Sequence, residues 1–292
     1  MSPQEYLATG STLKWLLAIA WLLPLAGFAV EVFGGYWSDR RSKIAAWLAV
    51  GCIATGFVCS AAALVTWGGA TDWSALALAD SHDEHAEDAE HAPAAPEGEE
   101  AAHGHEHPHG DADADHEHAS EGHDEEHAEH VAHDHPNDPF ASAFSGTFYE
   151  LGRFGRLAVS IDYYIDGLTL VMFCMVTLIA TCIHVFATGY MSDELTEDYE
   201  DHEVHLPGGR HFHRPGRYYR FFSYLSLFCF SMLGLVIAGN IFMVFVFWEL
   251  VGVCSYLLIG FYIERHTAST AANKAFIMNR VGDFGFLIGL MI

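Results

Sequence analysis

The sequence predicts an all-α, polytopic membrane protein with about six transmembrane helices. Hydrophobic residues make up 51% of the 292 residues, and six segments approach or exceed the roughly 20 apolar residues that a bilayer crossing needs. The formal net charge of −25 would suggest an acidic soluble protein, but 21 of the 38 acidic residues lie between residues 80 and 138. The rest of the chain is apolar and only slightly acidic, so we interpret it as a membrane protein with an acidic insertion.

Six spans are expected, and the longest connection, which contains the insertion, separates the second from the third. Pro24 predicts a mild kink in the first span, and no small-residue cleavage site follows that span, so we expect no cleaved signal peptide. The Gly239-Asn240 pair between the fourth and fifth spans predicts a tight turn and an antiparallel hairpin of helices. The spans are expected near residues 13–34, 44–69, 167–191, 219–239, 241–263 and 271–292.

The distribution of basic residues predicts the orientation of these spans. Nine Lys and Arg residues lie in or beside the connections at 35–43, 192–218 and 264–270, against three on the opposite side. Because cytoplasmic loops carry the excess of Lys and Arg, we expect the N-terminus and the acidic insertion to lie outside the cytoplasm. The expected location is a bacterial inner membrane.

The chain divides into four expected parts. Residues 1–79 hold the first two spans, 80–138 the acidic, His-rich insertion, 139–166 an external connection, and 167–292 the remaining four spans. Part of the connection alternates apolar and polar residues, which allows a short hairpin or an interfacial segment.

The insertion at 80–138 is of low complexity and contains 14 of the 20 histidines with no Lys or Arg. It has no apolar periodicity, so we expect disorder. Dense histidine and carboxylate groups attract Zn, Ni or Cu ions, but a defined site needs fixed geometry. We therefore expect incidental weak binding, with a metal buffer and a pH-responsive surface as alternatives. Representative ligands are His103, His105, His107 and His109.

The sequence gives no sign of a cofactor in this chain. The six cysteines lie in apolar segments without paired CxxC spacing, and we expect buried free thiols. There is no Gly-rich dinucleotide loop and no cysteine cluster for an iron–sulfur centre. We expect no nucleic-acid partner; the lipid bilayer is the expected surrounding.

Four ionisable residues lie where a membrane span should have none. Glu249 is near the middle of the fifth span, and Arg280 and Asp283 share one face of the sixth, with Lys274 nearer its start. Such residues are costly in hydrocarbon and are functional candidates, usually in ion or proton movement. For Glu249, a proton relay and a permanent structural ion pair are both open readings. A central cationic partner for Glu249 is not obvious in the sequence; Arg280 is the candidate within the spans, and it could also simply pair with Asp283.

Asp166 and His184 each allow a structural and a functional interpretation. Asp166 precedes the third span, where a helix cap is favoured over a transport role. His184, inside that span, is read as hydrogen-bonded structure, with a relay role as the alternative. His211 and His213 resemble a metal-ligand pair only weakly, and we read the 192–218 segment as a cytoplasmic connection.

Several motifs resemble a known family. WELVGVCSYLLIGFY at 248–262 and NKAFIMNRVGDFG at 273–285 closely resemble L subunits of bacterial NADH–quinone oxidoreductase, respiratory complex I. IDGLTL at 165–170, IHVFATGYM at 183–191 and YYRFFSYLSLF at 218–228 agree in order and spacing. The resemblance covers nearly all of the chain outside the insertion.

The resemblance implies a fold, a function and partners. The fold would be the N-terminal part of an antiporter-like fold with two inverted five-helix repeats and broken helices. The function would be proton translocation in the membrane arm, coupled to quinone reduction elsewhere, with no redox centre in this chain. Glu249, Arg280, Asp283 and Lys274 match the family's proton-path residues, and Asp166 matches its DGL aspartate. Other membrane-arm subunits, including an M-type neighbour, would be its partners.

The chain also departs from the family, whose members are much longer. We therefore expect this chain to be the N-terminal part of a longer protein. It lacks the lysine on the seventh helix that the family pairs with the glutamate, and we expect it to be unstable when isolated. Subunits of an Mrp-type cation/proton antiporter, a hydrogenase or a bicarbonate-uptake complex share the local motifs and stay as alternatives. An alternative of another class is a membrane-anchored external metal-binding loop.

Overall fold

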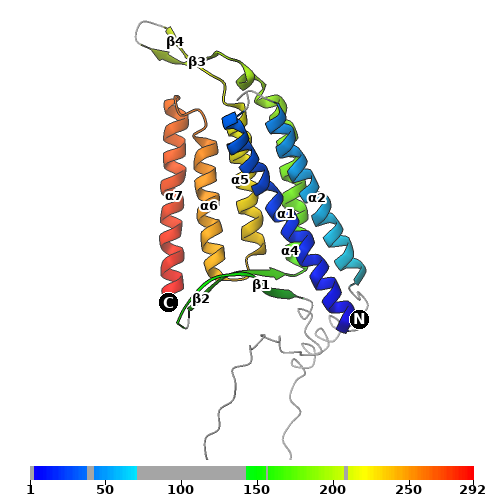
Figure 1. Cartoon of the computed structure of the whole chain (residues 1–292). Coiled ribbons are helices and arrows are strands. Elements are labelled where there is room, and N and C mark those ends of the chain that lie inside the picture. The colour runs from blue at the N-terminus through cyan, green and yellow to red at the C-terminus, as the bar shows by residue number, and fades with distance from the viewer. Residues whose placement is uncertain (1–2, 38–42, 71–142, 156, 207–209) are drawn as a thin grey trace, which may run out of the picture. The chain divides into compact units, whose positions relative to one another are not determined.

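The computed structural model describes residues 3–37, 43–70, 143–155, 157–206 and 210–292. Long helices run side by side, with one β-hairpin at each end of the helix bundle (Figure 1). The helices are α1 (Pro3–Trp37), α2 (Ile44–Ala70), α4 (Gly167–Tyr190), α5 (Tyr218–Ile237), α6 (Ile241–Ile259) and α7 (His266–Met291). The remaining elements are β1 (Phe144–Phe154), β2 (Leu157–Ile165), the short 3₁₀ helix η1 (Ser192–Leu195), β3 (Tyr199–Leu206) and β4 (Arg210–Arg214).

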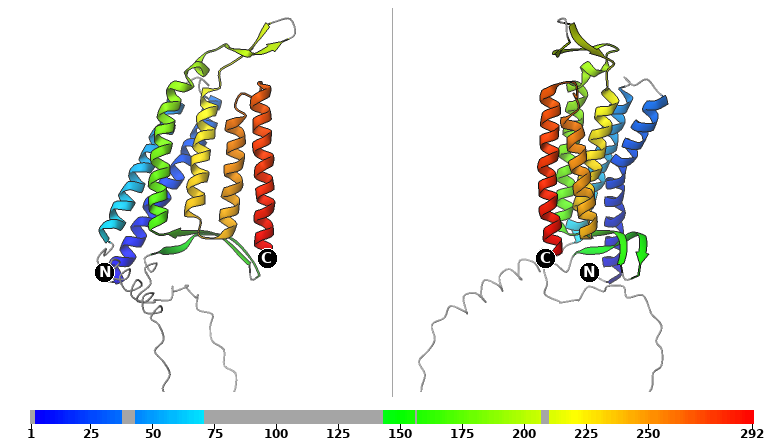
Figure 2. Two further views of the ribbon diagram at one scale, coloured as in Figure 1. Left: turned by 180° about the vertical axis from the view of Figure 1, so that it is seen from behind. Right: turned by 90° about the vertical axis from the view of Figure 1, so that its left-hand side faces the viewer.

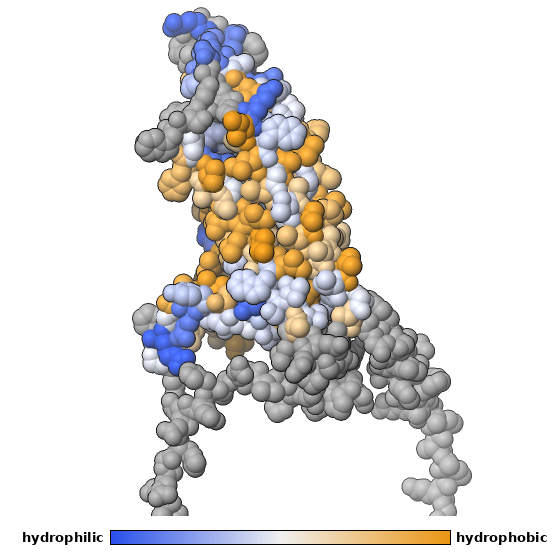
Figure 3. Space-filling model, turned by 45° about the vertical axis from the view of Figure 1, so that its right-hand side comes forward, coloured by the Kyte–Doolittle hydropathy of each residue, from blue (hydrophilic) through white to orange (hydrophobic). Residues whose placement is uncertain are grey.

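The helical, membrane-spanning fold class predicted from the sequence is confirmed. Five of the described helices are long and apolar enough to cross a membrane by length and composition: α2, α4, α5, α6 and the Ala8–Gly34 part of α1. Figure 3 shows a broad apolar belt across the face of the described bundle that is turned to the viewer, with hydrophilic side chains toward both ends. The sixth expected span exists as α7, but Lys274, Arg280 and Asp283 and its polar first half keep it outside that set.

The helix boundaries differ from the expected ones in three places. α1 starts at Pro3, well before the expected residue 13, because the polar segment before the span continues the helix. Pro24 lies inside α1, and Figure 2 shows this helix bent part-way along its length. α6 ends at Ile259 and α7 begins at His266, so the connection between them lies four to five residues earlier than the expected 264–270.

The predicted hairpin of α5 and α6 is confirmed, and its turn shows why the chain reverses there. Asn240 caps α6, because its Oδ1 accepts a hydrogen bond from the backbone N–H of Met243 at 2.8 Å. The side-chain Nδ2 of Asn240 also donates to the carboxylate of Asp162 at 2.7 Å and to the Ser160 carbonyl at 2.9 Å. One residue therefore starts α6 and attaches the turn to β2.

Aromatic side chains hold α1, α5 and α6 together. The indole N–H of Trp21 in α1 donates to the carbonyl of Phe230 in α5 at 3.2 Å, and the two rings stack at 5.4 Å. The rings of Trp21 and of Phe247 in α6 make an edge-to-face contact, with their centres 5.6 Å apart.

Between α1 and α2, Gly56 allows close approach, since a Cβ there would lie 3.3 Å from the Ala20 carbonyl oxygen.

One end of the bundle carries the hairpin of β1 and β2, in the segment where the alternation pattern allowed one. The strands are antiparallel, pair Phe144 with Ile165 at their open end, and contain two irregular registers. Gly155 takes a positive φ of 64° near the turn, where a side chain would strain the backbone. The hairpin lies across the bottom of the bundle in Figure 1, and its Tyr163 pairs with Ala238 after α5.

The opposite end carries the hairpin of β3 and β4 and a buried network of ion pairs. The Arg214 guanidinium binds both oxygens of Glu194 at 2.6 and 2.7 Å, and its Nε lies 3.3 Å from Glu264. Arg217 also pairs with Glu264, and its backbone N–H donates to Glu194 at 2.9 Å. The network joins η1, β4, the start of α5 and the connection between α6 and α7.

A second ion pair at this end joins β3 to the start of α7. Asp201 is fully buried and accepts a hydrogen bond from Arg265 at 2.9 Å. Burial by itself raises the pKa of the Asp201 carboxyl, but the hydrogen bonds from Arg265 and from the Glu203 backbone outweigh it and lower the pKa. The lowered pKa means that this pair stabilises the fold above about pH 3.9, and that the contribution is lost as the pH falls through the lowered value.

The acidic insertion, including His103, His105, His107 and His109, lies outside the described residues. The expectations of disorder and weak metal binding there stay predictions. Within the described part of the chain, no group of three or more His, Cys, Asp or Glu residues is arranged to hold a metal ion. His213 instead pairs with Asp198 at 3.1 Å on the surface of the β3–β4 hairpin.

Candidate functional site

The candidate site lies between α6 and α7 and is built around Glu249. This residue is near the middle of α6, far from the polar groups at either end of the helix. α7 packs alongside α6 and presents Arg280 and Asp283, three residues apart, toward it. Gly252, one turn from Glu249, allows this contact, because a Cβ there would lie 3.3 Å from the Asn279 amide nitrogen and 3.8 Å from an Arg280 nitrogen.

One guanidinium group is shared between two carboxylates. Nη2 of Arg280 pairs with Oε2 of Glu249, and its Nε lies 3.0 Å from Oδ2 of Asp283. The second contact is an ion pair by distance, but its angle is too poor for a hydrogen bond. The other oxygen of Asp283 accepts a hydrogen bond from the Trp248 indole at 2.9 Å. Trp248 therefore fixes Asp283, while the guanidinium lies between both acids.

The three side chains of the cluster differ in the fraction of their surface that is exposed. Asp283 is 7% exposed, Glu249 22% and Arg280 39%, within the described part of the protein. The Arg280 guanidinium also lies 4.9 Å from the centre of the Phe276 ring, on the same helix. The cluster therefore brings two acidic side chains and one basic side chain together.

Arg280, the candidate partner within the spans, pairs with Glu249 in the structure. The pair is compatible with a purely structural role of Glu249. It is also compatible with a proton relay, because the Arg280 guanidinium lies beside a second carboxylate as well. Asp283 supplies that carboxylate. The geometry brings three of the four expected proton-path residues together.

Lys274, the fourth, does not join the cluster. It is exposed, and six residues at about 100° per residue place it about 120° around α7 from Arg280. Among the ion pairs of the described residues, none involves Lys274. The expected graded series of Lys274, Arg280 and Asp283 is therefore not a continuous contact here.

Asp166 has the structural role that was favoured from the sequence. Its backbone is extended, and its Oδ1 accepts a hydrogen bond from the Thr169 N–H at 2.7 Å, so it caps α4.

We expect Asp166→Ala to lower the unfolding free energy of the full-length protein by about 1 kcal/mol, the usual loss for an N-cap. Asp166→Asn keeps an acceptor oxygen and should retain most of that stability and the transport rate. Denaturant titration in detergent and a proton-transport assay would measure both. A transport defect in Asp166→Asn with normal stability would instead assign Asp166 a transport role.

His184 also follows its structural reading. The side chain is 1% exposed inside the bundle, and its Nδ1 lies 2.7 Å from the Ala180 carbonyl of the preceding turn. It packs near Phe222 of α5. No contact among the described residues connects it to Glu249.

Sequence reasoning missed a buried acid within a membrane span, Glu31 in α1. It is only 3% exposed, although it lies in the last part of the first membrane span. The available signal was the single acidic residue within an otherwise apolar stretch, the same signal that identified Glu249.

Comparison with known proteins places the candidate site within matched segments. Two stretches match models of antiporter-like subunits. Residues 152–199 match "NADH-Ubiquinone oxidoreductase (complex I), chain 5 N-terminus", and residues 238–292 match "NADH:quinone oxidoreductase/Mrp antiporter, TM". The second stretch contains Glu249, Lys274, Arg280 and Asp283, and the first contains Asp166 and His184.

Relatives of the chain carry consistent names. It is 42% identical over 156 residues to the chloroplast NAD(P)H-quinone oxidoreductase subunit 5 of Chaetosphaeridium globosum, covering 53% of this chain and 20% of the relative. It is 44% identical over 137 residues to NAD(P)H-quinone oxidoreductase chain 5 of Synechocystis, covering 47% of this chain and 17% of the relative. The chain therefore spans about a fifth of the length of the curated relatives it matches.

These matches bear out the similarity to complex I at the level of chain 5 and the antiporter-like domain. The relatives named here are from chloroplasts and cyanobacteria, which is a broader setting than the bacterial L subunits that the motifs suggested.

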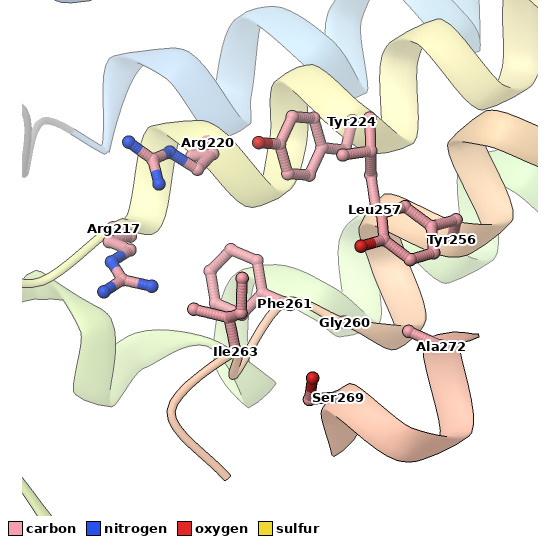
Figure 4. Close-up of a pocket in the computed structure, with 10 residues that line it drawn as sticks. All are labelled: Arg217, Arg220, Tyr224, Tyr256, Leu257, Gly260, Phe261, Ile263, Ser269 and Ala272. Carbon is pink, nitrogen blue, oxygen red and sulfur yellow. The ribbon is translucent and has the colours of Figure 1, made fainter. Parts of the chain in front are cut away.

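A separate pocket of about 110 Å³ lies between the start of α5, the end of α6 and the start of α7 (Figure 4). Arg217 and Arg220 border one side, and Tyr224 and Tyr256 another. It contains none of the predicted site residues. Because Arg217 is already paired with Glu264, we assign the pocket no role.

Proposed function

We propose that this chain is the N-terminal part of a proton-translocating membrane subunit of a complex I-type NAD(P)H–quinone oxidoreductase. The single observation that supports this best is the sharing of Arg280 between Glu249 and Asp283 inside a segment that matches the antiporter-like family. The names of the relatives support the quinone-reducing assembly.

The cluster suggests how a proton would be taken up and released. With Arg280 against Glu249, the ionised carboxylate is stabilised by the nearby cation. When the guanidinium moves toward Asp283, Glu249 loses its countercharge in a low-dielectric setting and the proton-bound acid is favoured. The return of the guanidinium would release the proton. Trp248, which binds Asp283, keeps the second acceptor in place.

The proposal includes an orientation and partners. The end with β3 and β4 carries most of the basic residues, so we place it in the cytoplasm or its organellar equivalent and the β1–β2 hairpin on the opposite side. The expected partners are other membrane-arm subunits, including an M-type neighbour, which would contact exposed apolar faces such as that of Val281 and Phe284. A bacterial inner membrane is the proposed location.

A second candidate function is that of a subunit of an Mrp-type cation/proton antiporter. It is favoured by one observation, the match of residues 238–292 to a family description that includes both assemblies.

Affinity purification of the full-length protein from its own membranes separates the two. We expect a co-purified assembly that reduces quinone with NAD(P)H in an inhibitor-sensitive reaction. An assembly without redox activity that acidifies vesicles in response to a Na⁺ gradient would contradict the complex I assignment and support the antiporter.

A further inference from the structure

Glu31 is a second acid inside the bundle, apart from the cluster around Glu249. It lies near the end of the Ala8–Gly34 membrane segment of α1, with 3% of its side chain exposed. α2 and α5, the two helices that pack against α1, cover its side chain. Glu249 makes its ion pair with α7 instead, so the two acids face different helices.

The surroundings of Glu31 are polar but carry no countercharge. The hydroxyl of Ser226 in α5 donates to Oε1 at a long 3.4 Å, and Ser223, one turn away, faces the same carboxyl. Oε2 is buried without a hydrogen-bond partner among the described residues. On the α2 side the titratable neighbour is Cys52; a Cβ at Gly27, one turn before Glu31, would lie 3.3 Å from its sulfur.

No Lys or Arg of the described residues pairs with Glu31. Lys43, the described basic residue where α2 begins, is exposed. A carboxylate with one weak hydroxyl donor and one unpartnered oxygen is a costly ion in an apolar interior, whereas the neutral acid is tolerated. The arrangement contrasts with Glu194, which is equally buried but is paired with Arg214 on both oxygens.

We propose that Glu31 is a proton-binding site between α1, α2 and α5, distinct from the Glu249–Arg280–Asp283 cluster. The bound species is a proton, held as a neutral carboxylic acid beside Ser223 and Ser226. The site lies toward the β3–β4 end of the bundle, because α1 ends and α5 begins there. The proposal does not depend on the proposed function, since proton binding at Glu31 is measurable without turnover.

Labelling of the full-length protein in its native membranes with dicyclohexylcarbodiimide tests this site. A protonated carboxyl adds across a C=N bond of this hydrophobic reagent, its proton passes to nitrogen, and an acyl shift leaves a stable N-acylurea with the mass of the whole reagent. We expect at least about tenfold more label on the Glu31 peptide than on the peptide of exposed Glu150, because an exposed carboxyl is almost wholly ionised at neutral pH.

The label on Glu31 should decrease as the pH is raised, disappear in Glu31→Gln, and persist in Glu249→Gln. It should not respond to Na⁺ at constant pH. Protection by Na⁺ would overturn the proposal, because the carboxylate and serine hydroxyls would then hold a metal cation. Infrared spectroscopy gives an independent readout in unlabelled protein: the carbonyl band of a neutral acid should be present in the wild type and absent in Glu31→Gln. Two identical spectra would also overturn the proposal.

Discussion

Replacing Glu249 by Gln in the full-length protein is expected to slow proton movement through this subunit by about 10²-fold or more. Groups positioned for proton transfer typically contribute about 10²–10⁴-fold to the rate, and Gln keeps the size of Glu but cannot take up and release a proton. The hydrogen bond from Trp248 of α6 to Asp283 of α7 does not involve Glu249, so the contact between α6 and α7 should survive. The measurement is the number of protons moved per quinone reduced in reconstituted vesicles.

Glu150→Gln is the matched control, because Glu150 pairs with Arg153 on the exposed β1–β2 hairpin and is remote from the cluster. It should leave the proton ratio unchanged. Both variants should assemble in normal amounts. An unchanged ratio in Glu249→Gln would remove Glu249 from the proton path and leave it as a structural partner of Arg280.

Arg214→Ala is expected to cause the largest loss of stability, about 3–5 kcal/mol of unfolding free energy. Its side chain is 3% exposed, and its removal leaves the carboxylate of Glu194, 1% exposed, without its double ion pair. The guanidinium also lies 4.6 Å from the centre of the Tyr199 ring, a contact that would be lost too. The loss arises mainly from the unpaired buried charge that remains. Denaturant titration of the purified full-length protein in detergent would measure it.

Arg153→Ala is the control for this prediction, since Arg153 and Glu150 are 65% and 45% exposed. Screening by water limits such a pair to about 0–1 kcal/mol. A loss in Arg214→Ala no larger than in Arg153→Ala would show that the network around Arg214 does not anchor the β3–β4 hairpin.

The sequence predicted the helices well because membrane spans need long apolar runs. The α5–α6 hairpin followed from the Gly239-Asn240 pair, and the caps by Asp166 and Asn240 follow from short side chains that can accept a helix N–H. Arg280 was the candidate partner of Glu249 within the spans, and the structure pairs the two. The charged residues within the apolar segments were therefore the sequence signal that led to the site.

Other features were not predicted. The sequence allowed the β1–β2 hairpin, but the β3–β4 hairpin and the Glu194–Arg214 pair lie in a connection whose mixed charge gave no sign of them. That Lys274 and Arg280 lie on different faces of α7 already follows from their spacing of six residues. Glu31 was overlooked although it is an acid in an apolar run; its contact with Ser226 of α5 joins segments far apart in the chain.

Infrared difference spectroscopy of the reconstituted complex tests whether Glu249 takes up and releases a proton during turnover. We expect a carbonyl band of a protonated carboxyl that changes when quinone reduction starts and is missing in Glu249→Gln. A difference spectrum that is the same in the wild type and in Glu249→Gln would show that Glu249 keeps one protonation state throughout. That result would exclude Glu249 as a proton carrier in this subunit.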